Sequence, residues 1–209
     1  MTAAGTGAGT AAGTGAEDAG FRVTASRHLL HARSSVRLDT LAGPDGTPFD
    51  REVVEHDDAV AVVAVDDDGR VALVRQYRHP TAGHLLEIPA GTLDVPGETV
   101  EDAARRELAE EAGLAAASLR PLGRVWNSAG WSDEATTLLL ATGLRPVAAP
   151  AGYEPRAEEA AMEVIWRPLD GLVAEALDGR LADAKTVVGL LRAAAVLGVG
   201  AARGGRGPS

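Results

Sequence analysis

The pattern of hydrophobic and polar positions along the chain predicts a mixed structure of strands and helices. Residues 60–65 and 71–77 are valine-rich runs separated by Asp66-Asp67-Asp68-Gly69. An Asp-Gly pair supplies the positive φ that a tight turn requires, so we predict a β-hairpin here. The same pattern predicts further strands over residues 27–38, 49–56, 85–88, 124–126, 136–141 and 162–166.

Three segments have the periodicity of helices. The clearest covers residues 99–112, because Thr99 and Asp102 have capping-box spacing and Gly113 follows the last helical position. Two more helices are predicted over 169–177 and 183–197. Strands and helices alternate too irregularly for a doubly wound parallel sheet, so the predicted fold class is α/β of the mixed α+β kind.

The two ends of the chain differ from the part between them. Residues 1–20 repeat Ala, Gly and Thr and contain almost no bulky apolar side chain, so burial cannot offset the entropy of ordering them. We predict that residues 1–20 and the tail 199–209 are disordered and that residues 21–198 form one domain.

Charge and composition exclude several classes of function. The chain has 30 Asp and Glu against 20 Lys and Arg, a net charge of −10, which argues against nucleic acid and membranes as partners. The absence of cysteine excludes disulfides, thiolate zinc sites and thiol catalysis. Since no signal peptide or spanning segment is recognised, we expect a soluble cytoplasmic protein.

The predicted helix over 99–112 carries the candidate chemistry. Glu107, Glu110 and Glu111 fall within an arc of about 100° on one face, where like charges at this spacing destabilise a helix. Solvent could relieve the repulsion, with Arg106 pairing with Glu110 at i,i+4. A bound hard cation could also relieve it, and oxygen ligands suit Mg²⁺ or Mn²⁺. The helix alone leaves both interpretations open.

The residues around this helix resemble a known family. Glu98, Arg106-Glu107-Leu108, Glu110-Glu111 and Gly113-Leu114 have the spacing of the Nudix box, which here covers residues 91–114. One departure is that six residues, not five, separate Gly91 from Glu98, which indicates an extra residue in the loop 93–97. The resemblance implies a Nudix-type α/β/α sandwich with a mixed β-sheet.

The resemblance extends to one branch of that family. Residues 49–54, 74–78 and 86–91 resemble the ADP-ribose pyrophosphatase branch, and residues 127–134 resemble its substrate loop, with Ala129 in place of the expected proline. It implies a homodimer that hydrolyses ADP-ribose, a nucleoside diphosphate derivative, to AMP and ribose 5-phosphate. Two alternatives remain: a Nudix hydrolase for another nucleotide sugar or a dinucleotide, and a non-catalytic sensor that binds ADP-ribose.

The resemblance also implies a metal site and its ligands. The Ala90 carbonyl, Glu107, Glu110 and Glu111 would bind Mg²⁺ (or Mn²⁺), although Glu110 could sit just outside the first shell of ligands. Arg106 would orient the glutamates. The alternative for Arg106 is an ordinary surface ion pair.

Substrate-binding and catalytic residues are implied in the same way. Arg78 would contact the phosphates, Arg51 and Glu52 the adenine and its ribose across a dimer interface, and Glu134 a metal or the terminal ribose. Glu158 or Glu159, in the loop 155–160, would be the general base that activates water. Apart from Glu134, each could instead be an ordinary surface side chain. The five histidines have no ligand-like spacing, and we expect them to be structural or exposed.

Overall fold

The computed structural model describes residues 20–32, 34–155 and 157–200, with the side chains of Glu158 and Glu159 left out. The chain divides into two compact units, Met1–Glu55 and His56–Ser209. Nearly all of the two predicted disordered segments lies outside the described residues. The predicted domain boundaries at residues 21 and 198 therefore stay predictions.

The described part of the first unit is an antiparallel sheet of β1 (Arg22–His31), β2 (Ser35–Ala42) and β3 (Pro48–Glu55), paired in that order. The prediction of one strand over 27–38 is wrong, because the chain reverses direction between β1 and β2, and His31 pairs with Ser35 across the reversal. The segment between the two strands has no Asn-Gly or Asp-Gly pair or other strong turn signal, so nothing in the sequence indicated the reversal. The predicted strand 49–56 agrees with β3 to one residue at each end.

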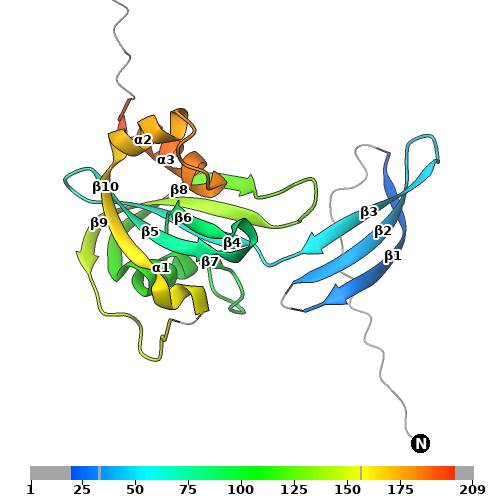
Figure 1. Cartoon of the computed structure of the whole chain (residues 1–209), viewed down its shortest axis with the longest axis horizontal. Coiled ribbons are helices and arrows are strands. Elements are labelled where there is room, and N and C mark those ends of the chain that lie inside the picture. The colour runs from blue at the N-terminus through cyan, green and yellow to red at the C-terminus, as the bar shows by residue number, and fades with distance from the viewer. Residues whose placement is uncertain (1–19, 33, 156, 201–209) are drawn as a thin grey trace, which may run out of the picture. The chain divides into compact units, whose positions relative to one another are not determined.

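A mixed sheet forms the centre of the second unit (Figure 1). Its strands are β4 (Ala59–Val65), β5 (Arg70–Arg78), β6 (Gly83–Glu87), β7 (Ala90–Thr92), β8 (Leu114–Trp126), β9 (Ala135–Pro146) and β10 (Glu163–Pro168). The strand order is β10-β5-β4-β9-β8, with β6 beside β5 and β7 beside β4. β4 and β9 are parallel, whereas the other pairs are antiparallel. The predicted hairpin of β4 and β5 is confirmed, and Gly69 in its turn has φ +74°.

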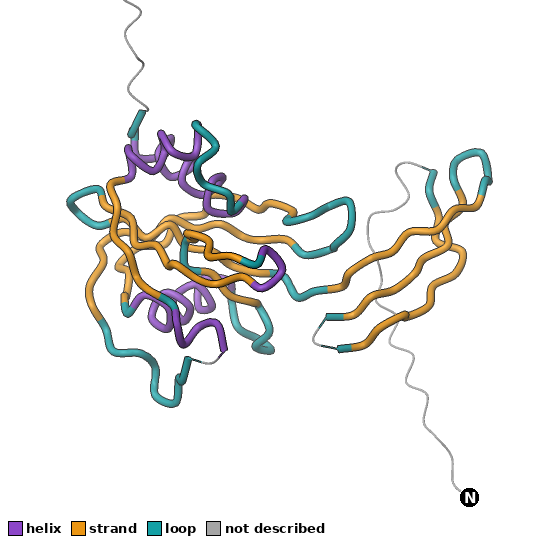
Figure 2. Tube along the Cα trace, in the orientation of Figure 1, coloured by secondary structure: helices purple, strands orange, loops and turns teal. Residues whose placement is uncertain are grey.

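Helices cover both faces of this sheet, as Figure 2 shows, and the alternation along β4 explains why. Val60 and Val62 point to one face, where they pack with α1 (Val100–Ala112). Ala61 and Val63 point to the other face, toward α2 (Leu169–Leu177) and α3 (Ala184–Leu197). All four side chains are fully buried, which explains the continuous apolar run in the sequence. The predicted α/β/α sandwich and its helices are confirmed.

Other predicted strands are shorter than, or shifted from, those observed. β8 covers 13 residues, although only 124–126 was predicted, because its first half is rich in Ala and Pro121 follows that half. A register shift between Pro121 and Gly123 accommodates the proline, and pairing with β9 determines the strand. Short 3₁₀ helices η1 (His79–Thr81) and η2 (Ala157–Ala161) complete the described elements. No helix among the described residues is long and apolar enough to span a membrane.

Candidate active site

The helix α1 begins and ends where its sequence predicts. The Thr99 hydroxyl oxygen accepts the Asp102 N–H at 3.1 Å, and Gly113 ends the helix with φ +64°. Ala103, Ala104 and Leu108 face the core. Glu107 is buried beside these residues, whereas Glu110 and Glu111 are half-buried.

Arg106 donates hydrogen bonds to three carboxylates, one just before α1 and two on it. Its Nε and Nη2 donate to the two carboxylate oxygens of Glu98 at 3.0 and 2.9 Å. Its Nη1 donates to Glu110 at 3.2 Å and also to Glu107. Hydrogen bonds to Glu98, together with the charge of Glu107, hold the pKa of Arg106 well above its usual value despite partial burial. The predicted i,i+4 pair of Arg106 and Glu110 is therefore present, as one contact in a larger network.

The extra residue in the loop before α1 leaves this network intact. Gly97 has φ +80°, and the Glu98 N–H donates to the Val95 carbonyl at 3.1 Å. This turn directly precedes Glu98, whose carboxylate reaches the guanidinium of Arg106. The departure from family spacing therefore does not prevent the pairing of Glu98 with Arg106.

Glu107 is buried directly against the backbone of Gly91. Its side chain is 10% exposed, and a Cβ added to Gly91 would overlap the carboxylate group. Burial raises the pKa of Glu107, and the charge of Arg106 opposes that effect. A carboxylate held in such a position needs a nearby positive charge to remain ionised.

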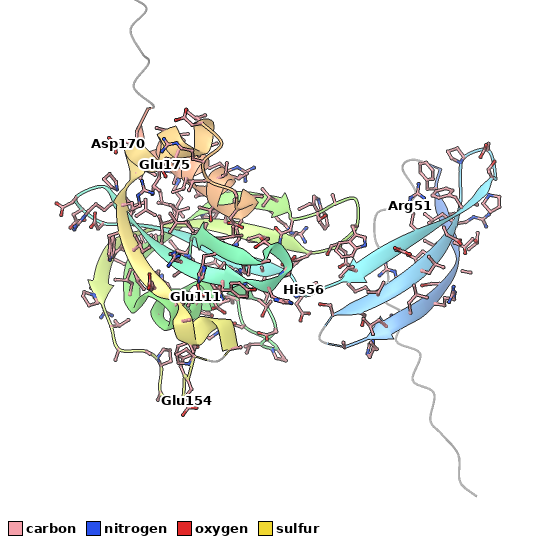
Figure 3. The ribbon with its side chains drawn as sticks, in the orientation of Figure 1. Arg51, His56, Glu111, Glu154, Asp170 and Glu175 are labelled. Atoms are coloured by element: carbon pink, nitrogen blue, oxygen red, sulfur yellow. The ribbon has the colours of Figure 1, made fainter. Side chains whose placement is uncertain are left out.

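Glu111 connects α1 to the short strand β7. Its carboxylate accepts the Ala90 N–H at 2.8 Å, so the helix and the Ala90-Gly91 segment are joined at two adjacent residues. Figure 3 labels Glu111 beside the strands of the second unit.

The donor set fits a divalent cation by its chemistry. It consists of the carboxylates of Glu107, Glu110 and Glu111 next to the backbone of Ala90, all of them oxygen ligands that Mg²⁺ and Mn²⁺ prefer. Among the described residues, no group of three or more acidic or histidine side chains is already arranged to hold an ion. Two of the three carboxylates are hydrogen-bonded to Arg106 instead. The assignment of these four ligands therefore stays a prediction.

Arg78 belongs to a buried charge network that the sequence analysis did not identify. Its Nε and Nη2 donate to the carboxylate of Glu87, both at 2.8 Å, and the Glu87 side chain is 1% exposed. Lys185 donates to the same Glu87 carboxylate and also to Asp183, at 2.9 Å. The sequence does distinguish Lys185, because it is the single lysine in a chain with 19 arginines.

Glu87 makes folding stability depend on pH in a defined direction. Burial raises the pKa of Glu87, but Arg78 and Lys185 outweigh burial and hold the pKa below its usual value of 4.5. The stabilisation is present above pH 4.5 and is lost as the pH falls through the lowered pKa, because the unfolded state then binds more protons. We predict that urea unfolding from pH 6 to pH 3 shows a steeper loss of stability for the native protein than for Glu87→Gln. Equal slopes would contradict this account of the pair.

Glu134 lies at the end of the loop 127–134. Its carboxylate is 3.8 Å from Nδ1 of His56, and its backbone N–H donates to the Ser132 hydroxyl at 3.1 Å. The neighbouring Ala135 N–H donates to Asp58 at 3.0 Å, which ties the loop to the start of β4. The structure thus pairs Glu134 with His56, and its predicted contact with a metal or ribose stays a prediction.

The remaining predicted residues lie elsewhere in the described structure. Arg51 and Glu52 are on β3 in the first unit, where the Arg51 guanidinium stacks on Phe49 at 4.6 Å from the ring centre. The backbone of Glu158 and Glu159 lies in η2, and their side chains are outside the described part of the chain. The roles predicted for these four residues stay predictions.

The chain is similar in sequence and in structure to known proteins. A family model described as NUDIX domain matches residues 55–188. An ADP-ribose pyrophosphatase of Mycobacterium tuberculosis is 41% identical over 83% of this chain and 83% of its own length. A methanol dehydrogenase activator of Bacillus methanolicus is 34% identical over 73% of this chain and 80% of its own. The crystal structure of an ADP compounds hydrolase, 25% identical, covers 87% of this chain and 96% of its own, with a TM-score of 0.72.

Proposed function

The chain belongs to the Nudix family of hydrolases, and from that premise we propose that it cleaves the pyrophosphate bond of ADP-ribose to give AMP and ribose 5-phosphate. The observation that carries the proposal is the carboxylate cluster on α1, organised by Arg106 and packed against Gly91. The substrate is supported by relatives that match most of the chain, an ADP-ribose pyrophosphatase and an ADP compounds hydrolase.

The cofactor of this family is a divalent metal ion, and we propose Mg²⁺, with Mn²⁺ as a substitute. Glu107, Glu110, Glu111 and the Ala90 carbonyl would hold it. When bound, the ion offsets the negative charge of the site and polarises the phosphoryl oxygens of the substrate. The buried position of Glu107 supports this assignment, because a cation would favour the ionised form that burial disfavours.

Two arginines, Arg106 and Arg78, have different roles in the proposed reaction. Arg106 fixes the orientation of three carboxylates through its contacts to Glu98, Glu107 and Glu110. Arg78 is 40% exposed in its side chain and lies within the electrostatic field of Glu111, beside the site. A guanidinium there suits the pyrophosphate, which accepts planar, paired hydrogen bonds.

A general base completes the proposed reaction. We assign it to Glu158, with Glu159 as the alternative, and η2, which contains both, lies against β5. A base removes a proton from the attacking water in the transition state and contributes little to substrate binding.

We predict that Glu158→Gln lowers kcat by about 10²–10⁴-fold and raises KM far less. The matched control is Glu159→Gln, the same substitution one residue away. Steady-state kinetics with ADP-ribose and Mg²⁺ compare the two variants. If Glu159→Gln alone lowered kcat, the base would be Glu159 and our assignment of Glu158 would be wrong.

We also propose a homodimer that uses the first unit. Phe21, Val23, Leu29 and Leu30 are 42–56% exposed on or beside β1, the edge strand of its sheet. Such a set of apolar side chains suits contact with a second copy. The interface would bring Arg51 and Glu52 to the nucleoside of the substrate. Sedimentation equilibrium tests the dimer, and a monomer at micromolar concentration would count against it.

A cytoplasmic location likewise stays a prediction.

A substrate panel with metal titration tests the proposed function. We expect the highest kcat/KM for ADP-ribose, lower values for other nucleotide sugars and dinucleotides, and no turnover in excess chelator. A nucleotide sugar or dinucleotide with a higher kcat/KM would keep the reaction and change the substrate. Binding of ADP-ribose with no product in Mg²⁺ or Mn²⁺ would favour a sensor instead.

A further inference from the structure

The buried carboxylate of Glu87 accepts hydrogen bonds from two cations on different elements. Arg78 reaches it from the end of β5, and Lys185 reaches it from the first turn of α3. Glu87 itself is the last residue of β6, the strand that pairs with the end of β5. Because the carboxylate is 1% exposed, it can hold both cations in a fixed geometry with little competition from water.

The way in which Glu87 binds Arg78 determines which edge of the guanidinium faces outward. The pair uses Nε and Nη2. It leaves Nη1, with its two N–H groups, outside the fork. A guanidinium anchored along one edge presents the opposite edge in a defined direction, as recognition of a phosphate oxygen requires.

Lys185 changes how strongly Glu87 competes for Arg78. It donates to Oε2 of Glu87, the oxygen that also accepts from Nη2 of Arg78. Two cations therefore share one carboxylate, and Arg78 is neutralised less than it would be in an isolated pair. Lys185 is itself held by Asp183, the residue that caps α3.

The first turn of α3 also contacts the segment 87–90, which ends at Ala90, the proposed backbone ligand of the metal. The Ile88 N–H donates to the Thr186 hydroxyl at 2.9 Å, and Thr186 is fully buried. Ile88 stands between Glu87 and Ala90, so one short segment connects the Arg78 network to the backbone next to Glu111. The segment 87–90 thus contacts both Arg78, through Glu87, and Glu111, through Ala90.

We propose that Glu87, supported by Lys185, is a positioning residue that holds Arg78 with its Nη1 edge toward the pyrophosphate of the substrate. This inference rests on the proposed function. Glu87 touches no reacting atom in this account, and its effect on activity passes through Arg78.

A double-mutant cycle tests whether Glu87 acts through Arg78. In steady-state kinetics with ADP-ribose and Mg²⁺, we expect Arg78→Ala and Glu87→Gln each to raise KM by about 10–100-fold with a smaller change in kcat, because each removes a charge-assisted hydrogen bond. The double variant should have the KM of Arg78→Ala alone. Multiplied effects in the double variant, or an unchanged KM in Glu87→Gln, would overturn the proposal.

Two further variants separate positioning from folding. Glu87→Asp keeps both cations paired but withdraws the carboxylate by one methylene, so it should raise KM while remaining folded. Glu175→Gln is the matched control. Arg167 on β10 donates from two nitrogens to the carboxylate of Glu175 on α2, so this substitution also breaks a two-nitrogen arginine–glutamate pair. Figure 3 shows Glu175 well separated from Glu111. Loss of activity in Glu175→Gln equal to that in Glu87→Gln would overturn the proposal.

A binding measurement keeps the inference testable if ADP-ribose is not hydrolysed. The single lysine gives one ¹⁵Nζ side-chain signal after selective labelling with ¹⁵N-lysine. Titration with inorganic pyrophosphate in the absence of metal should shift this signal in the native protein and leave it unmoved in Arg78→Ala. Turnover failure would refute the proposed function alone, whereas an unmoved signal in the native protein would refute the positioning role.

Discussion

Glu111→Gln should lower kcat for ADP-ribose in Mg²⁺ by about 10³-fold and leave the fold intact. The amide has the same shape as the carboxylate and retains an oxygen that can accept the Ala90 N–H, so the link between α1 and β7 persists. What it removes is the negative charge with which a ligand holds a divalent cation. Several kcal/mol of transition-state stabilisation depend on that cation, and each 1.36 kcal/mol corresponds to about tenfold in rate.

The matched control for this substitution lies on the same helix. Glu101→Gln makes the same change at an exposed residue of the first turn, away from the contacts of Arg106. It should leave kcat and the melting temperature within experimental error. Kinetics at saturating Mg²⁺ and thermal unfolding are measured for both variants. A Glu111→Gln variant with native kcat would contradict the metal assignment.

Gly91→Ala should reduce kcat/KM by about 100-fold and lower the melting temperature by a few degrees. The added Cβ would overlap the carboxylate carbon of Glu107, so this group must move and its hydrogen bond to Arg106 is disturbed. Forcing an extra carbon into a packed site costs about 1–3 kcal/mol of folding stability. A misplaced catalytic carboxylate costs about 10²-fold in rate.

Another glycine in the same unit provides the comparison. Gly171 lies in α2, and a Cβ added there would meet no atom within 4 Å. Gly171→Ala should therefore keep native activity and raise stability slightly, since alanine loses less backbone entropy in a helix. If Gly91→Ala behaved as Gly171→Ala does, the close packing of Glu107 on Gly91 would have no role in catalysis.

The parts of the fold that the sequence predicted well are those with local causes. The helix α1 is bounded by Thr99 and Gly113, whose effects act within one turn, and the β4–β5 hairpin depends on Asp68-Gly69. The carboxylates of α1 follow from helical spacing alone. The family resemblance then connected them to Ala90 and Gly91, which meet Glu111 and Glu107 in the structure.

The parts that were missed depend on contacts between distant segments. Lys185 and Glu87 are 98 residues apart, and no spacing rule relates them. β8 exists because it pairs with β9, although its first residues have low strand propensity. The reversal between β1 and β2 brings His31 opposite Ser35 within a segment that has no turn signal such as Asn-Gly or Asp-Gly. In each case tertiary pairing, which no short window of sequence contains, decided the outcome.

The most direct test of the central claim is the identity of the products that the protein releases from ADP-ribose. ³¹P NMR of a reaction with Mg²⁺ should show the two pyrophosphate signals replaced by two phosphomonoester signals, those of AMP and ribose 5-phosphate, with no inorganic phosphate. The reaction should stop in excess chelator. Unchanged pyrophosphate signals in both Mg²⁺ and Mn²⁺, or release of inorganic phosphate, would contradict the account.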